Sequence, residues 1–153
     1  MRIVEDIADD DQLGVIATAV RDAGIALEIC PRSNLQTGAS CGPLSRHPFD
    51  RLRRLGFVVT VSPDNRLLSG TTLSDELIDL AATFDYAVAD IVQLQVAAAD
   101  VAFIEPADRT FLKDTILAAS SVSELSSVRT DDADVEQYSL RGPSLGHESI
   151  PPR

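Results

Sequence analysis

The segment FVVTV at residues 57–61 is a continuous apolar run between a glycine and a Ser-Pro-Asp turn signal, which predicts a buried β-strand. A second apolar run, IALEIC at residues 25–30, predicts another strand that ends at Pro31. Between them, HPFDRLRRLG at residues 47–56 predicts a helix, with Pro48 in its first turn and Gly56 at its end. Strand, helix and strand in this order indicate a parallel α/β sheet covered by helices on both faces, with a right-handed crossover.

Further helices are predicted on both sides of this unit. Apolar residues recur at helical spacing in residues 10–23, 77–84, 88–103 and 108–119. The polar segments 32–38 and 62–66 follow the two strands and are expected to form a loop and a turn. Thr72 or Ser74 can cap the helix that continues through residues 77–84. The chain is therefore expected to be rich in helix after its last strand.

The composition changes at residue 120. From there on Ser, Asp and Glu dominate, and apolar periodicity is absent. The sequence therefore predicts a folded region at residues 1–119 and a flexible, acidic and Ser-rich tail at residues 120–153.

The charge of the chain excludes one class of partner. The 153 residues contain 13 basic and 24 acidic side chains, and the formal net charge is −11. Such a chain, without a cluster of basic residues, does not neutralise a phosphate backbone, so nucleic acid is not an expected partner. Because no run approaches the length of about 18 apolar residues that a membrane span needs, no membrane association is expected either. A cytoplasmic location is predicted.

Cysteine and histidine provide no self-contained metal site. Cys30 and Cys41 lack the Cys-x-x-Cys spacing, and they are interpreted as a buried thiol behind a strand and an incidental loop thiol. His47 is expected to be a solvated residue at a helix start, and His147 to lie in the tail. Neither histidine belongs to a familiar zinc motif.

Asp64 is the first candidate for chemistry, because it follows the carboxyl end of the strand at 57–61. In parallel α/β folds, catalytic side chains come from this end of the strands. Position alone leaves a second interpretation open, since Asp64 and Asn65 are also favourable turn residues.

A wider pattern resembles the carboxyl-terminal half of adenosine deaminases. It consists of LEICP, SN and QTG in residues 27–38, HP at 47–48, VTV at 59–61, DN at 64–65 and SGTTL at 69–73. The opening RIVED at residues 2–6 resembles the segment that follows a Gly-His-Gly motif in bacterial members. The resemblance covers residues 2–119, and its specificity comes from the order and spacing of the motifs together.

The resemblance implies part of a (β/α)8 TIM barrel that hydrolyses adenosine to inosine and ammonia in purine salvage. In that family, one zinc ion is held by three histidines and an aspartate and activates the attacking water. By match of motif, Asp64 would be the zinc-binding aspartate that also orients this water. Asn65 would bond a purine ring nitrogen, and Ser33 matches a serine near the mouth of the site.

The sequence departs from the family pattern in several places. The zinc-binding histidines, the proton-transferring glutamate and a further proton-transferring histidine have no counterpart in the matched motifs. Pro63 stands where a Thr is usual, and Arg32 where a Ser is usual. Three outcomes follow: a truncated deaminase that is inactive alone, half of a split enzyme completed by an amino-terminal partner with the zinc histidines, or a non-catalytic fragment that self-associates through open barrel edges. The first is the predicted one.

Overall fold

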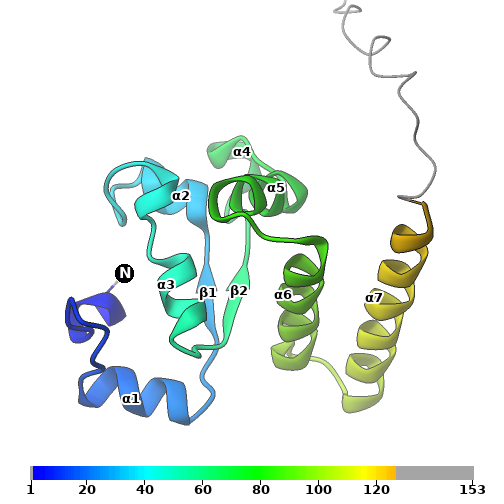
Figure 1. The fold of residues 1–153 in the computed structure, drawn as a ribbon, viewed down its shortest axis with the longest axis horizontal. Coiled ribbons are helices and arrows are strands. Elements are labelled where there is room, and N and C mark those ends of the chain that lie inside the picture. Colours follow the sequence, from blue (N-terminus) through cyan, green and yellow to red (C-terminus); the bar gives the residue numbers. More distant parts are fainter. Residues whose placement is uncertain (1, 127–153) are drawn as a thin grey trace, which may run out of the picture.

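The computed structural model describes residues 2–126, which form a helix-rich fold around a small parallel sheet (Figure 1). The elements are two 3₁₀ helices, seven α-helices and two strands: η1 Arg2–Asp6, α1 Val15–Asp22, β1 Leu27–Ile29, α2 Pro31–Gln36, η2 Leu44–Arg46, α3 Phe49–Arg54, β2 Val59–Val61, α4 Arg66–Ser69, α5 Leu73–Phe84, α6 Val88–Val101 and α7 Pro106–Ser126. The predicted abundance of helix after the second strand is confirmed.

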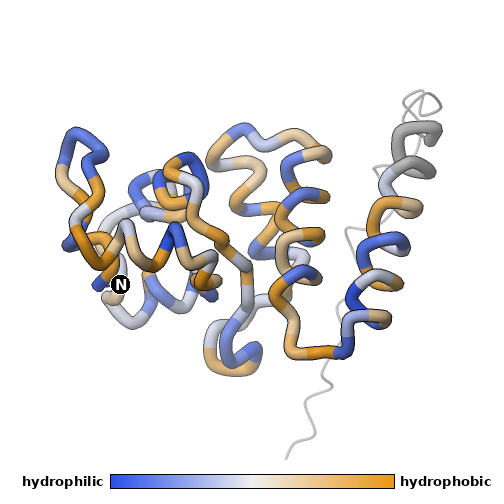
Figure 2. The backbone as a smooth tube through the Cα atoms, turned by 90° about the horizontal axis from the view of Figure 1, so that it is seen from below, coloured by the Kyte–Doolittle hydropathy of each residue, from blue (hydrophilic) through white to orange (hydrophobic). Residues whose placement is uncertain are grey.

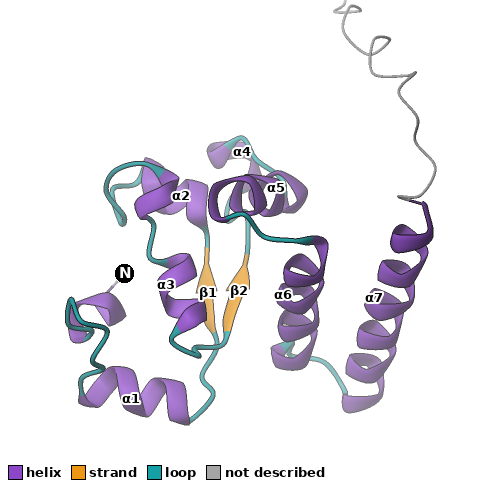
Figure 3. Cartoon of the chain, viewed as in Figure 1, coloured by secondary structure: helices purple, strands orange, loops and turns teal. Residues whose placement is uncertain are grey.

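The two strands pair in parallel, as the sequence predicts, and Leu27 is opposite Val59 in the register. The chain passes from β1 to β2 through α2, η2 and α3, so the segments that follow both strands meet at one end of the sheet (Figure 3). Both strands are shorter than the apolar runs that predict them. The first residue of the apolar run at 57–61 belongs to the end of α3 and not to β2. Gly56 has φ +82° there, and the Phe57 amide donates to the carbonyl of Leu52.

The hydrophobic core lies against one face of the sheet. The side chains of Ile29 and Val59 point into the core, where they join Phe49, Leu52 and Leu80. On the other face, the neighbouring positions carry Glu28, which is exposed, and Thr60, which is half-buried. Strand side chains alternate between faces, so the apolar cover that the sequence predicts for both faces is found on one, and the second face carries polar residues beside the end of α6.

Two short helices occupy segments that are predicted to be loop and turn. Helix α2 starts at Pro31 in its first turn, and the Thr37 hydroxyl donates to the carbonyl of Ser33. Helix α4 is capped by Asn65 and ends at Gly70, which has φ +59°. Polar residues that favour turns also cap helices, so their composition does not separate a loop from a single helical turn.

The helices after β2 follow the predicted positions. Thr72, one of the two proposed caps, begins α5, and its hydroxyl and the Asp75 carboxylate form a reciprocal capping box. Helix α7 packs on α6, and hydrophobic and hydrophilic residues alternate along it (Figure 2). It continues to Ser126, beyond the predicted boundary at residue 119, and residues 127–153 of the predicted tail lie outside the described residues. No helix within residues 2–126 has both the length and the apolar character needed to cross a membrane.

Candidate active site

The carboxyl ends of β1 and β2 bring together the candidate residues that the sequence analysis singles out. Ser33 lies in α2, directly after β1, and Asp64 lies in the loop after β2. The Ser33 hydroxyl donates a hydrogen bond of 2.7 Å to Oδ2 of Asp64. Ser33 is buried, whereas Asp64 is exposed. A rigid, buried donor thus holds one oxygen of a carboxylate that remains open to solvent.

The backbone at Asp64 has a positive φ, in the left-handed region that favours glycine. Asp64 has φ +56°, which is a left-handed conformation that aspartate tolerates better than most residues. Its amide donates to the Ser62 hydroxyl over 3.3 Å. Pro63 has no amide hydrogen and a restricted φ, so the turn is narrowly defined. Oδ1 of Asp64 accepts no hydrogen bond from residues 2–126 and is the free oxygen of the carboxylate.

Asn65 is the N-cap of α4, and its side-chain oxygen caps the helix. Oδ1 accepts hydrogen bonds from the amides of Leu67 and Leu68, each over 3.1 Å. This arrangement fixes which end of the carboxamide is the oxygen, and Nδ2 has no hydrogen-bond partner among residues 2–126. The side chain is exposed beside Asp64 in the sequence and can therefore donate to an acceptor atom of a ligand.

Cys30, which the sequence analysis interprets only as a thiol behind a strand, is a neighbour of this site. It is half-buried at the end of β1, and its thiol lies close enough to Ser62 for a hydrogen bond. Burial raises the pKa of the thiol, the bond with Ser62 opposes this shift, and the negative charge of Asp64 adds to it. The parallel register extended by one residue places Cys30 opposite Ser62, so this contact could have been found from the strand pairing.

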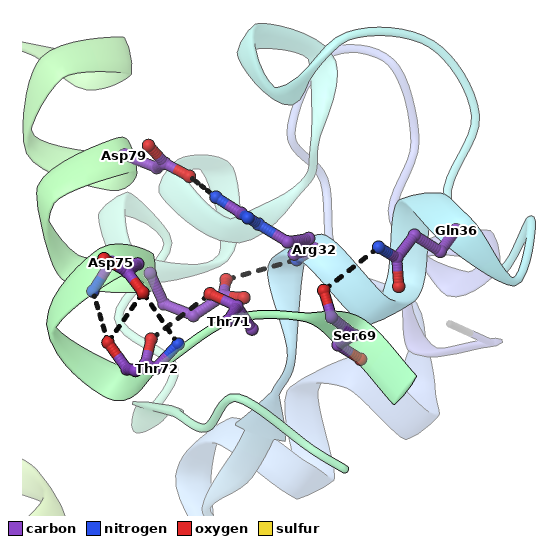
Figure 4. Close-up of polar contacts among 8 residues, drawn as sticks. Arg32, Gln36, Ser69, Thr71, Thr72, Asp75 and Asp79 are labelled. Carbon is purple, nitrogen blue, oxygen red and sulfur yellow. Dashed lines mark hydrogen bonds and ion pairs between the residues drawn. The ribbon is translucent and has the colours of Figure 1, made fainter. Parts of the chain in front are cut away.

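Helix α2 is attached to the start of α5 by charged groups (Figure 4). Oε2 of Glu76 accepts a hydrogen bond from the Arg32 amide over 3.2 Å, and Arg32 Nη2 lies 2.6 Å from Asp79 Oδ2. Glu76 is only 1% exposed. Burial raises the pKa of its carboxyl, while the Arg32 amide, the Arg32 charge and Thr71 oppose the shift. Arg32, a departure from the family pattern, thus has a structural partner.

Glu76 was not a candidate in the sequence analysis. It stands in the first turn of a predicted helix, where an acidic residue needs no other explanation. Only the packing of α5 on α2 shows that its carboxyl group is buried.

His47 is buried, with 3% of its surface exposed, so the prediction of a solvated residue is wrong. Nδ1 accepts a hydrogen bond from the Phe49 amide over 3.2 Å, and the opposite nitrogen, Nε2, lies 3.3 Å from Oδ1 of Asn34. In the neutral ring, Nε2 therefore carries the proton and donates it to Asn34. Burial lowers the pKa of the ring. The pairing connects the start of α3 to α2, which also carries Ser33.

The described residues do not complete a metal site. No three His, Cys, Asp or Glu side chains within residues 2–126 are grouped so that they could hold a metal ion. Both of the ring nitrogens of His47 are already engaged. A single carboxylate does not bind zinc at useful affinity. Asp64 is thus one donor, and the donor set present in this part of the chain does not fit a zinc ion.

The sequence is similar to adenosine deaminases. The family model described as "Adenosine deaminase" matches residues 2–119. The adenosine deaminases of Mycolicibacterium gilvum and Mycobacterium marinum are each 43% identical to the chain over 121 residues, which is 76% of this chain. The matched part is 33% of each relative, so the chain spans about a third of the length of the curated relatives that it matches.

The fold is similar to that of solved deaminases of the TIM-barrel type. An adenine deaminase from Arthrobacter aurescens superimposes with a TM-score of 0.66 and 21% identity, covering 69% of this chain and 32% of the other. An N6-methyl-AMP deaminase from Arabidopsis thaliana superimposes with a TM-score of 0.65 and 23% identity, covering 76% of this chain and 33% of the other. The predicted fold class, part of a (β/α)8 barrel, is confirmed.

Proposed function

Because the chain belongs to the adenosine deaminase family, we propose that it supplies the Asp64 side of a zinc-dependent site that converts adenosine and water to inosine and ammonia in cytoplasmic purine salvage. The observation that carries this proposal is the hydrogen bond from Ser33 to Asp64 at the carboxyl end of the sheet. The buried Ser33 holds Oδ2 of Asp64, so that Oδ1 keeps a fixed direction and has no partner among residues 2–126. The next residue, Asn65, offers the amide group of its side chain as a donor.

Each of the three residues has a distinct role in the proposal. Asp64 would offer one carboxylate oxygen to the metal site, and its charge would orient a water there. Ser33 positions that carboxylate by holding its other oxygen. Asn65 donates a hydrogen bond from Nδ2 to a purine ring nitrogen, since its Oδ1 is committed to the cap of α4.

The zinc ion would activate water for attack on the purine ring. The donors of this chain do not hold that ion by themselves, so the remaining ligands and the proton-transferring groups would come from polypeptide outside these 153 residues. We therefore expect the chain alone to be a truncated, inactive part of a deaminase, and the split arrangement to be active. Self-association without catalysis is the alternative, and the open edge of the small sheet favours it.

Loss of adenosine absorbance tests the proposal. The purified chain with zinc and adenosine should yield no inosine. Co-expression with the part of the Mycobacterium marinum adenosine deaminase that this chain does not match should restore inosine formation. Asp64→Ala should abolish the restored activity, and Asp114→Ala, at an exposed position of α7, should leave it unchanged. Inosine formation by the chain alone that depends on Asp64 would contradict the expected inactivity, and an active Asp64→Ala complex would contradict the assigned site.

A further inference from the structure

Helix α2, which carries Ser33, has no cap from its own flanking residue. Cys30 precedes the helix and makes no side-chain hydrogen bond to it, and Pro31 in the first turn has no amide hydrogen. The first amide that needs an acceptor is therefore that of Arg32. The acceptor comes from a distant part of the chain, since Oε2 of Glu76 in α5 receives this hydrogen bond over 3.2 Å. Glu76 thus caps α2 across 44 positions of sequence.

The environment of Glu76 is unfavourable for a carboxyl group that serves only packing. The side chain is 1% exposed, and Oε1 accepts no hydrogen bond of normal geometry from residues 2–126, although Thr71 lies near the group. Removal of a carboxyl group from water is costly, and an apolar side chain of the same size would avoid this cost. The hydrogen bond from the Arg32 amide is the contact that an apolar side chain could not replace.

The capped amide and the serine of the candidate site are neighbours in the sequence. Ser33 follows Arg32 in the first turn of α2, and its hydroxyl donates to Oδ2 of Asp64 over 2.7 Å. Because Ser33 is buried, its side chain moves only if the backbone of this turn moves. A small shift of the turn would lengthen or misalign the bond to Asp64. The direction of this carboxylate is thus connected to Glu76 through the backbone of α2.

We propose that Glu76 is a positioning residue of the candidate site. Its cap on the first turn of α2 places the Ser33 hydroxyl against the carboxylate of Asp64. The inference rests on the proposed function for the reaction that this geometry serves. An ion pair of 2.6 Å between Arg32 and Asp79 lies beside the cap (Figure 4). Its two side chains are 38% and 44% exposed, so it contributes little, and the role belongs to Glu76.

A double-mutant cycle on the full chain tests this role without zinc or substrate. Ser33→Ala should raise the equilibrium constant of unfolding by about fivefold in the parent chain, because the bond to Asp64 is lost. Glu76→Met keeps the length of the side chain and removes the carboxyl oxygens. In that background, Ser33→Ala should raise the constant by at most about twofold. Glu76→Gln keeps an acceptor for the Arg32 amide and should restore the full effect of Ser33→Ala.

Two control backgrounds show whether the coupling is specific. Arg32→Ser removes the ion pair with Asp79 and keeps the amide, so Ser33→Ala should have its full effect there. Ile91→Val removes a methyl group from the packing of α6 and should also leave this effect unchanged. An equal effect of Ser33→Ala in the parent and Glu76→Met chains would overturn the inference. A loss of the effect in the Arg32→Ser chain would assign the role to the guanidinium group and would overturn the inference as well.

Amide hydrogen exchange provides a measurement that does not depend on the folding of the Glu76→Met chain. The Arg32 amide should be protected by about tenfold or more in the parent chain, and the protection should persist in the Glu76→Gln chain. An Arg32 amide that exchanges freely in the folded parent chain would contradict the cap and overturn the inference.

The complex with the unmatched part of the Mycobacterium marinum adenosine deaminase separates this inference from the proposed function. In an active complex, Glu76→Met should lower kcat by roughly tenfold and leave KM unchanged, and Glu76→Gln should rescue kcat. A change in KM alone would overturn the inference. A parent complex that forms no inosine would contradict the proposed function, while the cycle would still decide the inference. An additive cycle together with an active complex would overturn the inference and leave the proposed function intact.

Discussion

The hydroxyl of Ser33 and the carboxylate of Asp64 are joined by a hydrogen bond of 2.7 Å across 31 positions of sequence. Their positions follow from the parallel pairing of β1 and β2, which places the first turn of α2 beside the loop after β2. The bond connects a buried residue with an exposed one, so it determines the direction of a carboxylate that solvent alone would leave free to rotate.

Removal of the Ser33 hydroxyl should lower stability and disturb the site. We expect Ser33→Ala to reduce the free energy of unfolding by about 1 kcal/mol, because a hydrogen bond to a charged but solvent-exposed acceptor is lost. Chemical denaturation checks this value. Ser45→Ala, at an exposed position of η2, is the matched control and should be neutral. Equal stability of the two variants would show that the bond contributes nothing.

The cap of α4 can be separated from the donor function of Asn65. Asn65→Ala should lower the free energy of unfolding by about 1 kcal/mol, because the amides of Leu67 and Leu68 lose their acceptor. Asn65→Asp should retain this stability, since a carboxylate oxygen caps equally well. Thermal or denaturant unfolding of the three proteins measures the difference. An Asp variant as unstable as the Ala variant would contradict the capping role.

Acid should destabilise the fold through His47. Burial lowers the pKa of this ring from 6.5 in the folded chain. As the pH falls through 6.5, the unfolded chain takes up a proton that the folded chain does not, so the stability declines until the pH reaches the lowered pKa. Denaturation at a series of pH values from about 7 to about 5 should show this decline, and His47→Gln should reduce it. An unchanged pH dependence in the variant would rule out His47 as its source.

Glu76 should have the opposite pH dependence. Burial raises the pKa of its carboxyl from 4.5, so the folded chain keeps a proton that the unfolded chain has released as the pH rises past 4.5. Stability is lost over the interval up to the raised pKa, and the penalty is fully present above it. Glu76→Gln keeps an acceptor for the Arg32 amide and removes this penalty. We expect it to stabilise the chain at neutral pH by on the order of 1 kcal/mol.

The control for this variant is Glu105→Gln, at an exposed position between α6 and α7. It should leave the unfolding midpoint unchanged. A Glu76→Gln protein that is less stable than the parent at neutral pH would show that the ionised carboxylate is favourable in its buried position.

Elements whose signals are local could be predicted from the amino-acid sequence. Apolar runs predicted β1 and β2, Gly56 predicted the end of α3, and Thr72 was one of two predicted caps of α5. These signals depend on backbone conformation and on hydrogen bonds between near neighbours, which a short stretch of residues specifies. The motifs around Ser33, Asp64 and Asn65 likewise predicted the family and the end of the sheet where the candidate site lies.

Which polar groups are buried and which surface is open could not be predicted from the sequence, because both depend on how distant segments pack. His47 and Glu76 lie inside the fold because helices distant in sequence pack over them, and nothing in their own neighbourhoods distinguishes them from solvated residues at helix starts. Conversely, Glu28 lies on a strand that the sequence predicts to be covered on both faces, and its side chain is exposed. Burial is a property of contacts between distant segments, so it depends on the complete packing and not on the local sequence.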